Sequence, residues 1–258
     1  MQTSFYEPAR FGSYLATGAT AGPWDPSAQH GGPPSALAVR ELENHEPDDS
    51  MRLARVAVDI LRPVPIGTIT VRTRTVRPGK RVALLEAVLA SGGQEVLVAR
   101  GWRLARHPDL PVVSRGGDVP QLPTSDSPPR FPGGSVDGYL ARIEWRFEHG
   151  NFDDPGPCSA WGRPRIPLLP GEELSPMARS LLIADTGSGL SMVLDPRQYL
   201  FINVDVTVAL QRDPVGEWIR LDAVSSMGGT GTGLAETQLS DTTGAVGIAV
   251  QTLLVAPR

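Results

Sequence analysis

Apolar and turn-forming residues in the first hundred positions predict one helix followed by four strands. Residues 30–46 read HGGPPSALAVRELENHE, in which two prolines open a segment rich in apolar and helix-forming residues. The runs that follow are separated by turn residues, and residues 69–76 alternate apolar side chains with Thr or Arg, the pattern of a half-buried strand. The predicted strands span residues 53–60, 69–76, 82–90 and 95–104.

The same order of elements returns in the second half. Strand-like segments at residues 143–149 and around Trp161 precede a helix, for which Ser175 is the predicted N-cap and Pro176 the first helical residue. This helix is predicted to run through Asp185. Four more strand-like runs follow, at residues 200–210, 217–225, 232–239 and 246–255.

Matching residues recur at a nearly constant separation, which suggests that one unit has been duplicated. The separation is 149 for one group and 150 for the other. The first group is Pro65/Pro214 and Gly67/Gly216, and the second is Val96/Val246 and Ala99/Ala249. Chance similarity between valine-rich strands is the alternative explanation.

Residues 107–138 interrupt the pattern, because they are rich in Pro, Gly, Ser and Asp and poor in apolar residues. We therefore predict an N-terminal unit at residues 1–106, a linker at 107–138 and a C-terminal unit at 139–258. In each unit a four-stranded antiparallel sheet can bury one face by wrapping around the helix. A cleft between the two units would suit a small molecule.

Composition narrows the class of protein. The 28 glycines and 25 prolines are about a fifth of the 258 residues, which excludes a helical bundle. A hydrophobic content of 40% and a net charge of −4 favour a packed core over disorder. We see no basic cluster for nucleic acid, no apolar run long enough to span a membrane and no signal peptide. These features predict a cytoplasmic protein.

Candidate chemistry from cysteine and histidine is sparse. Cys158 is the only cysteine, so an internal disulfide and a multi-cysteine zinc site are excluded. It reads as a small hydrophobic residue, with a nucleophile as the alternative. The four histidines show no metal-binding spacing, so no metal is expected. The sequence lacks a G-x-S-x-G motif, and GGTGTG at residues 228–233 lacks the lysine of a phosphate-binding loop.

Several segments together resemble the acyl-CoA thioesterase II family and its shorter thioesterase-like relatives. The resemblance covers nearly the whole chain except the linker. It is carried by QHGGPPSALAVREL (29–42), LRPVPIG (61–67), residues 175–194, FINVDVTVALQR (201–212) and AVQTLLVAPR (249–258). The resemblance implies an α+β double hotdog fold, in which two tandem helix-wrapped antiparallel sheets form one continuous sheet. It also implies a homo-oligomer, a dimer or larger.

The resemblance further implies hydrolysis of acyl-CoA thioesters to free fatty acid and CoA by a base-activated water. CoA belongs to the substrate, and no cofactor is expected. In the family an Asp, a Thr and a Gln hold the water, and these roles fall here on Asp185, Asn203 and Gln251. Asn203 departs from the family Thr, although an amide can still orient a water. Only the second half carries these polar residues, because Gly101 occupies the position in the first half that corresponds to Gln251.

Each site residue also has a plainer interpretation. Asp185 follows four apolar residues, which would suit a desolvated base, but without the resemblance a cap at the helix end is the favoured interpretation. Gln251 could lie on the polar face of its strand, and Asn203 could be an edge or bulge residue. His30, Gly31 and Gly32 are candidate substrate-binding residues whose N–H groups could face a thioester oxygen or a phosphate. The alternative is a tight turn with His30 packed on a tryptophan.

Two rival functions remain open from the sequence. A non-hydrolytic acyl-CoA or acyl-carrier binding protein would explain the Asn at position 203. A hotdog enoyl-CoA hydratase or dehydratase would share the fold and the carrier, and such enzymes pair an Asp with a nearby His.

Overall fold

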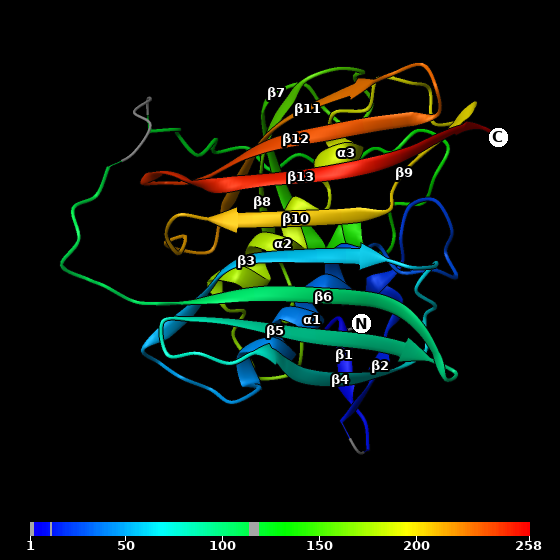
Figure 1. The fold of residues 1–258 in the computed structure, drawn as a ribbon. Coiled ribbons are helices and arrows are strands. Elements are labelled where there is room, and N and C mark those ends of the chain that lie inside the picture. Colours follow the sequence, from blue (N-terminus) through cyan, green and yellow to red (C-terminus); the bar gives the residue numbers. More distant parts are fainter. Residues whose placement is uncertain (1–2, 11, 114–118) are drawn as a thin grey trace.

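A single curved antiparallel sheet forms the body of the protein (Figure 1). The computed structural model describes residues 3–10, 12–113 and 119–258. Within these residues the strand order is β1-β2-β4-β5-β6-β3-β10-β13-β12-β11-β8-β7, and β9 pairs with β13. The strands are β1 (Tyr6–Pro8), β2 (Ser13–Ala16), β3 (Met51–Ile60), β4 (Thr68–Arg77), β5 (Val82–Ser91), β6 (Gln94–Ala105), β7 (Ile143–His149), β8 (Cys158–Pro164), β9 (Tyr199–Asn203), β10 (Asp205–Leu210), β11 (Ile219–Met227), β12 (Thr232–Asp241) and β13 (Gly244–Pro257).

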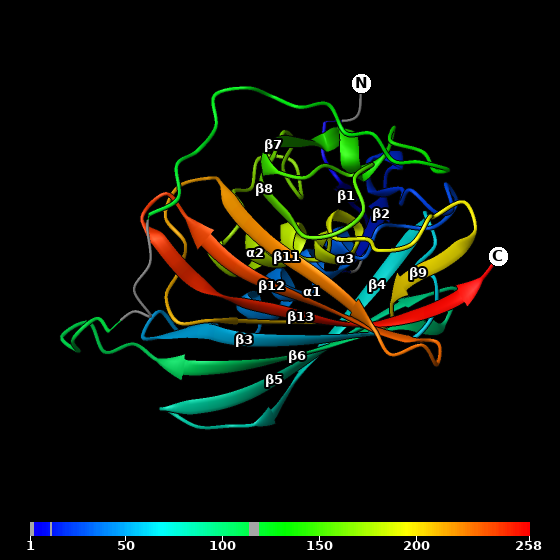
Figure 2. The same cartoon turned by 90° about the horizontal axis from the view of Figure 1, so that it is seen from above.

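The helices lie inside the curve of this sheet, as Figure 2 shows. They are α1 (Gly32–Asn44), α2 (Pro176–Ala184) and α3 (Gly187–Leu190), with 3-10 turns η1 (Gly18–Thr20) and η2 (Tyr139–Arg142). Helices α1 and α2 pack against each other as well as on the strands. This arrangement confirms the predicted double hotdog, two helix-wrapped units joined in one continuous sheet.

Local sequence explains where α2 begins and ends. The Ser175 hydroxyl accepts a hydrogen bond from the Ala178 N–H at 3.1 Å, and Pro176 occupies the first helical position, both as predicted. Most of the helix is buried, because one side faces α1 and another faces the sheet. The helix ends at Asp185, which adopts a helical conformation as the C-cap.

The strand register confirms the internal repeat. In the first unit Leu85 pairs with Gly101, and in the second Ala235 pairs with Gln251, a shift of 150 on both strands. The central strands β3 and β10 pair so that Ala57 faces Thr207, which are themselves 150 residues apart. The two-fold axis that relates the two units therefore passes between β3 and β10.

One predicted strand is wrong in its extent. Residues 200–210 form two strands, β9 and β10, with a break at Val204. At this position the Val204 N–H donates to the Thr252 carbonyl, while the Val204 carbonyl accepts from the Ile60 N–H. The chain thus passes from pairing with β13 alone to pairing with β3 and β13 together.

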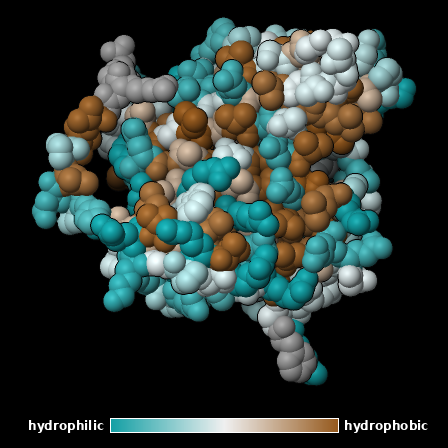
Figure 3. All heavy atoms as spheres, in the orientation of Figure 1, coloured by the Kyte–Doolittle hydropathy of each residue, from teal (hydrophilic) through white to brown (hydrophobic). Residues whose placement is uncertain are grey.

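The outer face of the sheet is open and mixed in character. Figure 3 shows apolar and polar side chains side by side over the strands. Exposed apolar residues on this face of the second unit include Val224, Leu234 and Ile248. Arg74 of the first unit is exposed and pairs with Glu86, as expected for a solvated strand.

Cys158 begins β8 and is completely buried. Burial raises the pKa of its thiol to about 12, so the group stays protonated and unreactive at neutral pH. This environment supports the structural interpretation of the cysteine.

The division into residues 1–106, 107–138 and 139–258 stays a prediction. Residues 1–2, 11 and 114–118 lie outside the described residues, and the last five belong to the predicted linker. From residue 119 onward the linker lies on the folded units, as the contacts of Ser127 with β7 and of Ser135 with Pro23 show.

An ion pair between Arg212 and the buried Asp241 stabilises the end of β12. Asp241 is fully buried and accepts hydrogen bonds from the Arg212 guanidinium and from the Val215 N–H. Burial alone would raise the pKa of Asp241, but these hydrogen bonds and those from Thr243 outweigh it and hold the pKa well below its ordinary value.

We expect Asp241→Asn to lower the free energy of unfolding by about 1–3 kcal/mol near neutral pH, because the Arg212 pair loses its charge. Since the pKa of Asp241 is depressed by folding, its contribution is complete above the ordinary Asp pKa of about 4 and is lost as the pH falls toward the folded pKa. Urea unfolding near pH 7 and near pH 3 measures this. The gap between wild type and variant should shrink at the lower pH, and a constant gap would contradict the assignment. Exposed Asp49→Asn is the control.

Candidate active site

Asp185 lies at the junction of α2 and α3, beside the N-terminus of α1. Its side chain is almost completely buried. The Asp185 Oδ2 atom is 2.9 Å from His30 Nδ1, and Oδ1 accepts a hydrogen bond from Asn203 Nδ2 at 2.8 Å. Two of the predicted catalytic residues and one predicted substrate-binding residue therefore meet around a single carboxylate.

Gln251 lies against the backbone of the same junction. Its Nε2 donates to the Asp185 carbonyl at 3.0 Å, and its Oε1 accepts from the Ser188 N–H at 2.9 Å. The side chain is fully buried. Gln251 thus holds the main chain on both sides of Asp185, whereas Asn203 contacts the carboxylate itself.

Tyr139 holds the His30 ring in place. The two rings stack with centroids 3.9 Å apart and planes 14° apart, so the aromatic partner is a tyrosine and not the tryptophan considered from the sequence. The Tyr139 hydroxyl donates to the Leu182 carbonyl at 2.6 Å and lies 3.0 Å from Thr186 Oγ1. Burial raises the pKa of Tyr139 well above its ordinary value, so the hydroxyl stays neutral.

The chain before α1 is fixed by Gln29. Its amide nitrogen donates to the Pro65 carbonyl at 2.8 Å, and its amide oxygen accepts from the buried Tyr6 hydroxyl at 2.5 Å. The His30 N–H donates to the Thr20 carbonyl. These bonds leave His30 little freedom to move away from Asp185.

Two glycines let the elements approach this closely. A Cβ on Gly31 would lie 2.8 Å from Asp185 Oδ2 and 2.9 Å from Oδ1. A Cβ on Gly32 would collide with the Leu182 carbonyl oxygen of α2. Both positions have helical or near-helical backbones, so glycine is needed here for space and not for its conformational freedom.

The His30–Asp185 contact is short enough to be a hydrogen bond. A nitrogen and a carboxylate oxygen at 2.9 Å need a hydrogen between them. The Gly32 N–H also points at His30 Nδ1, at 3.1 Å, so the start of α1 and Asp185 meet at the same ring nitrogen.

A cavity of about 520 Å³ opens onto this cluster. His30, Gly31, Asp185 and Asn203 line it, together with Ser188 of α3. The rest of the wall is largely apolar. Its buried or half-buried apolar members are Trp24, Val64, Phe131, Leu140, Phe152 and Phe201. The size and the balance of apolar wall and few polar groups are typical of small-molecule sites.

The equivalent place in the first unit has no polar set. Gly101 is 150 residues before Gln251, and a Cβ added there would meet Leu53 and Leu42. Leu53 itself is 150 residues before Asn203. Leucine side chains fill the space that the amides occupy in the second unit.

Sequence reasoning missed Tyr139, Gln29, Ser188 and Phe131. Gln29 could have been suspected as the neighbour of His30, but Tyr139 and Phe131 carry no local signal and reach the site through tertiary packing. Among the described residues, no group of three His, Cys, Asp or Glu side chains could hold a metal ion.

Two family profiles match the chain. The acyl-CoA thioesterase N-terminal domain matches residues 20–104, and the acyl-CoA thioesterase C-terminal domain matches residues 117–255, more than half of the chain. The chain belongs to the acyl-CoA thioesterase family. No curated protein matches its sequence.

Solved structures share the thioesterase fold at low sequence identity. The chain is similar to a candidate thioesterase II from Thermobifida fusca YX, with 17% identity, a TM-score of 0.75 and coverage of 99% of this chain and 98% of the other. It is also similar to the acyl-CoA thioesterase II TesB2 from Mycobacterium marinum, with 16% identity, a TM-score of 0.65 and coverage of 98% and 95%. The chain is similar, too, to a hot dog protein of unknown function from Alicyclobacillus acidocaldarius. The sequence identity is 14%, the TM-score is 0.74, and the match covers 97% of this chain and 95% of the other.

No helix in the described part of this thioesterase-family chain is long and apolar enough to cross a membrane.

Proposed function

We propose that this protein hydrolyses acyl-CoA thioesters to free fatty acid and CoA. The observation that carries the proposal is a buried carboxylate, Asp185, that faces an apolar cavity and is held by His30 and Asn203. Thioester hydrolysis needs such a base beside a water and an acyl pocket. Membership of the acyl-CoA thioesterase family supports this reaction class.

In the proposed mechanism Asp185 removes a proton from a water held with Asn203, and the water oxygen attacks the thioester carbonyl carbon. The C–S bond of the tetrahedral intermediate then breaks, and the proton passes from Asp185 to the CoA sulfur. The fatty acid thus gains the OH group of the water and the CoA thiol gains its proton. No covalent acyl-enzyme forms. His30 holds the Asp185 side chain through its ring nitrogen, and Gln251 keeps Asp185 in position through the backbone.

The Gly31 N–H is the proposed donor to the thioester oxygen. It lines the cavity next to Asp185 and has no hydrogen-bond acceptor among the residues that the structure describes. The prolines that follow in α1 have no N–H, and the Gly32 N–H is directed at His30. One free amide at the start of a helix is well suited to a developing oxyanion.

Release of free thiol from a panel of acyl-CoA thioesters tests the function. We expect turnover of at least one acyl-CoA that is linear in enzyme concentration. Binding of acyl-CoA without any thiol release would contradict hydrolysis and would instead support the non-hydrolytic acyl-CoA or acyl-carrier binding protein.

One observation favours a second candidate, an enoyl-CoA hydratase or dehydratase. Such enzymes pair an Asp with a His, and the fold brings His30 and Asp185 together although they are 155 positions apart in the sequence. Loss of enoyl-CoA absorbance without thiol release would identify this reaction in the same assay.

We further propose that the protein acts in fatty acid metabolism in the cytoplasm, as a homo-oligomer and without a cofactor. The lack of a membrane-spanning helix in the described residues is consistent with this setting.

A further inference from the structure

The wall of the cavity includes charged, exposed residues and buried, aromatic residues. Arg62 and Arg258 belong to the exposed part of its wall, while Phe131 and Phe152 belong to the buried part, at 7% and 2% exposure. An acyl thioester has the same polarity, with a charged carrier at one end and an apolar chain at the other. The polarity of the wall therefore orients a bound thioester with its chain toward the phenylalanines.

A series of contacts connects a charged residue of the wall to a buried aromatic one. The Arg258 guanidinium lies 5.2 Å from the centre of the Trp24 ring, and Trp24 meets Phe131 edge to face at 5.1 Å and 86°. Exposure falls along this series from Arg258 through Trp24 to Phe131. Phe131 is thus the most buried member of this series of contacts.

Phe131 comes from the linker, and the main chain on its C-terminal side is tightly docked. The Ser135 N–H donates to the Pro23 carbonyl at 3.1 Å, and the Tyr139 N–H donates to the Ala21 carbonyl at 2.9 Å. A Cβ on Gly134 or Gly138 would collide with the backbone of residues 21–23. These contacts fix the linker against the segment that carries Trp24.

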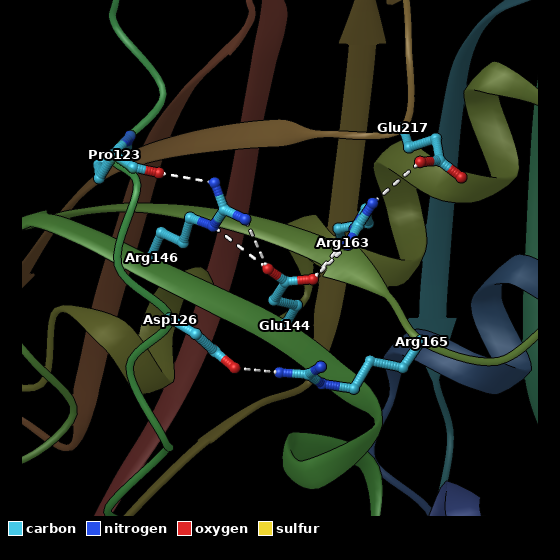
Figure 4. A network of polar contacts seen from close by, with 7 residues as sticks. All are labelled: Pro123, Asp126, Glu144, Arg146, Arg163, Arg165 and Glu217. Atoms are coloured by element: carbon cyan, nitrogen blue, oxygen red, sulfur yellow. Dashed lines mark hydrogen bonds and ion pairs between the residues drawn. The ribbon is translucent and has the colours of Figure 1, made fainter.

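On the N-terminal side the linker is held by Arg146 of β7 and by Arg165, which directly follows β8 (Figure 4). Arg146 donates to the Pro123 carbonyl at 2.7 Å, and Arg165 pairs with Asp126 at 2.6 Å. Glu144 is buried and accepts hydrogen bonds from Arg146 and Arg163, which keeps Arg146 oriented toward the linker. Phe131 is therefore anchored from both directions and has a defined position in the wall.

We propose that Phe131, supplied by the linker, closes the acyl end of the cavity and determines which acyl chain lengths the protein accepts. This inference rests on the proposed thioester substrate. Truncating the ring opens space for several methylenes at the buried end, and each methylene newly buried strengthens binding about fourfold.

The test compares kcat/KM for straight-chain saturated acyl-CoA thioesters of increasing length. We expect Phe131→Ala to move the optimum to longer chains, with a gain of about fourfold for each methylene that enters the new space. Phe131→Trp should move the optimum to shorter chains. Val136→Ala is the matched control, because Val136 lies in the same linker and packs on the core without lining the cavity.

An unchanged optimum in both Phe131 variants, or an equal loss at all lengths, would overturn the proposal. Phe131→Leu provides a smaller opening if the alanine variant fails to fold, as judged by its melting curve. Calorimetric binding of non-hydrolysable S-alkyl-CoA thioethers gives the same length profile without turnover. A shifted thioether profile in a protein that releases no thiol would refute hydrolysis and still support the role of Phe131.

Discussion

Replacing Asp185 with Asn is expected to lower kcat for acyl-CoA hydrolysis by about 10³-fold, the range lost with a general base. The amide cannot take a proton from water, yet it preserves the geometry. Its oxygen can still accept the Asn203 Nδ2 hydrogen bond, and its nitrogen can donate to His30 Nδ1. The variant should therefore bind acyl-CoA and melt near the wild-type temperature. Thiol release, acyl-CoA binding and thermal unfolding measure these three properties.

Asp205→Asn is the matched control for that experiment. Asp205 also lies near Asn203, whose Nδ2 donates to its carbonyl, and its Oδ1 accepts the Thr252 N–H at 2.6 Å. It does not line the cavity, so the same change of carboxylate to amide should leave kcat within a few fold. Asp185→Ala should also abolish hydrolysis in a folded protein. Undiminished turnover in either Asp185 variant would refute the assignment of the base.

Individual helices and strands could be predicted from sequence because their determinants are local, whereas the double hotdog that joins them was implied by the family resemblance. The Ser175-Pro176 start of α2 and the alternation in β4 follow from neighbouring residues alone. The break at Val204 could not be predicted this way. It arises because the chain there joins Ile60 and Thr252, which lie on strands far away in the sequence.

The candidate site was only partly accessible from sequence. The resemblance identified Asp185, Asn203 and Gln251. The separate roles of the two amides depend on tertiary contacts, which the spacing of residues in the sequence does not reveal. Gln251 holds backbone, whereas Asn203 holds the carboxylate. The His30–Asp185 pair forms because the start of α1 packs on the end of α2, and Tyr139 joins it from beyond the linker.

Adding one methyl group at Gly31 is expected to lower kcat about 100-fold, the order of loss for a misplacement near 1 Å. The new Cβ would lie within 3 Å of both carboxylate oxygens of Asp185, so the carboxylate must move from His30 and Asn203. Gly31 has φ −65° and ψ −21°, which alanine adopts readily, so the helix itself should tolerate the change. Steady-state thiol release measures the loss of activity in Gly31→Ala. Thermal unfolding shows whether the variant is still folded.

Gly189→Ala makes the same chemical change in the same cavity without a collision. Gly189 lines the cavity, but nothing lies within 4 Å of an added Cβ there. Its kcat should stay within about twofold of wild type, since surface changes without a steric or polar conflict cost little. If Gly31→Ala retained full activity, Asp185 could work from a displaced position, and a base fixed by His30 and Asn203 would be excluded. A large loss in Gly31→Ala alone, with an unchanged melting temperature, shows that catalysis depends on the geometry between Gly31 and the Asp185 carboxylate.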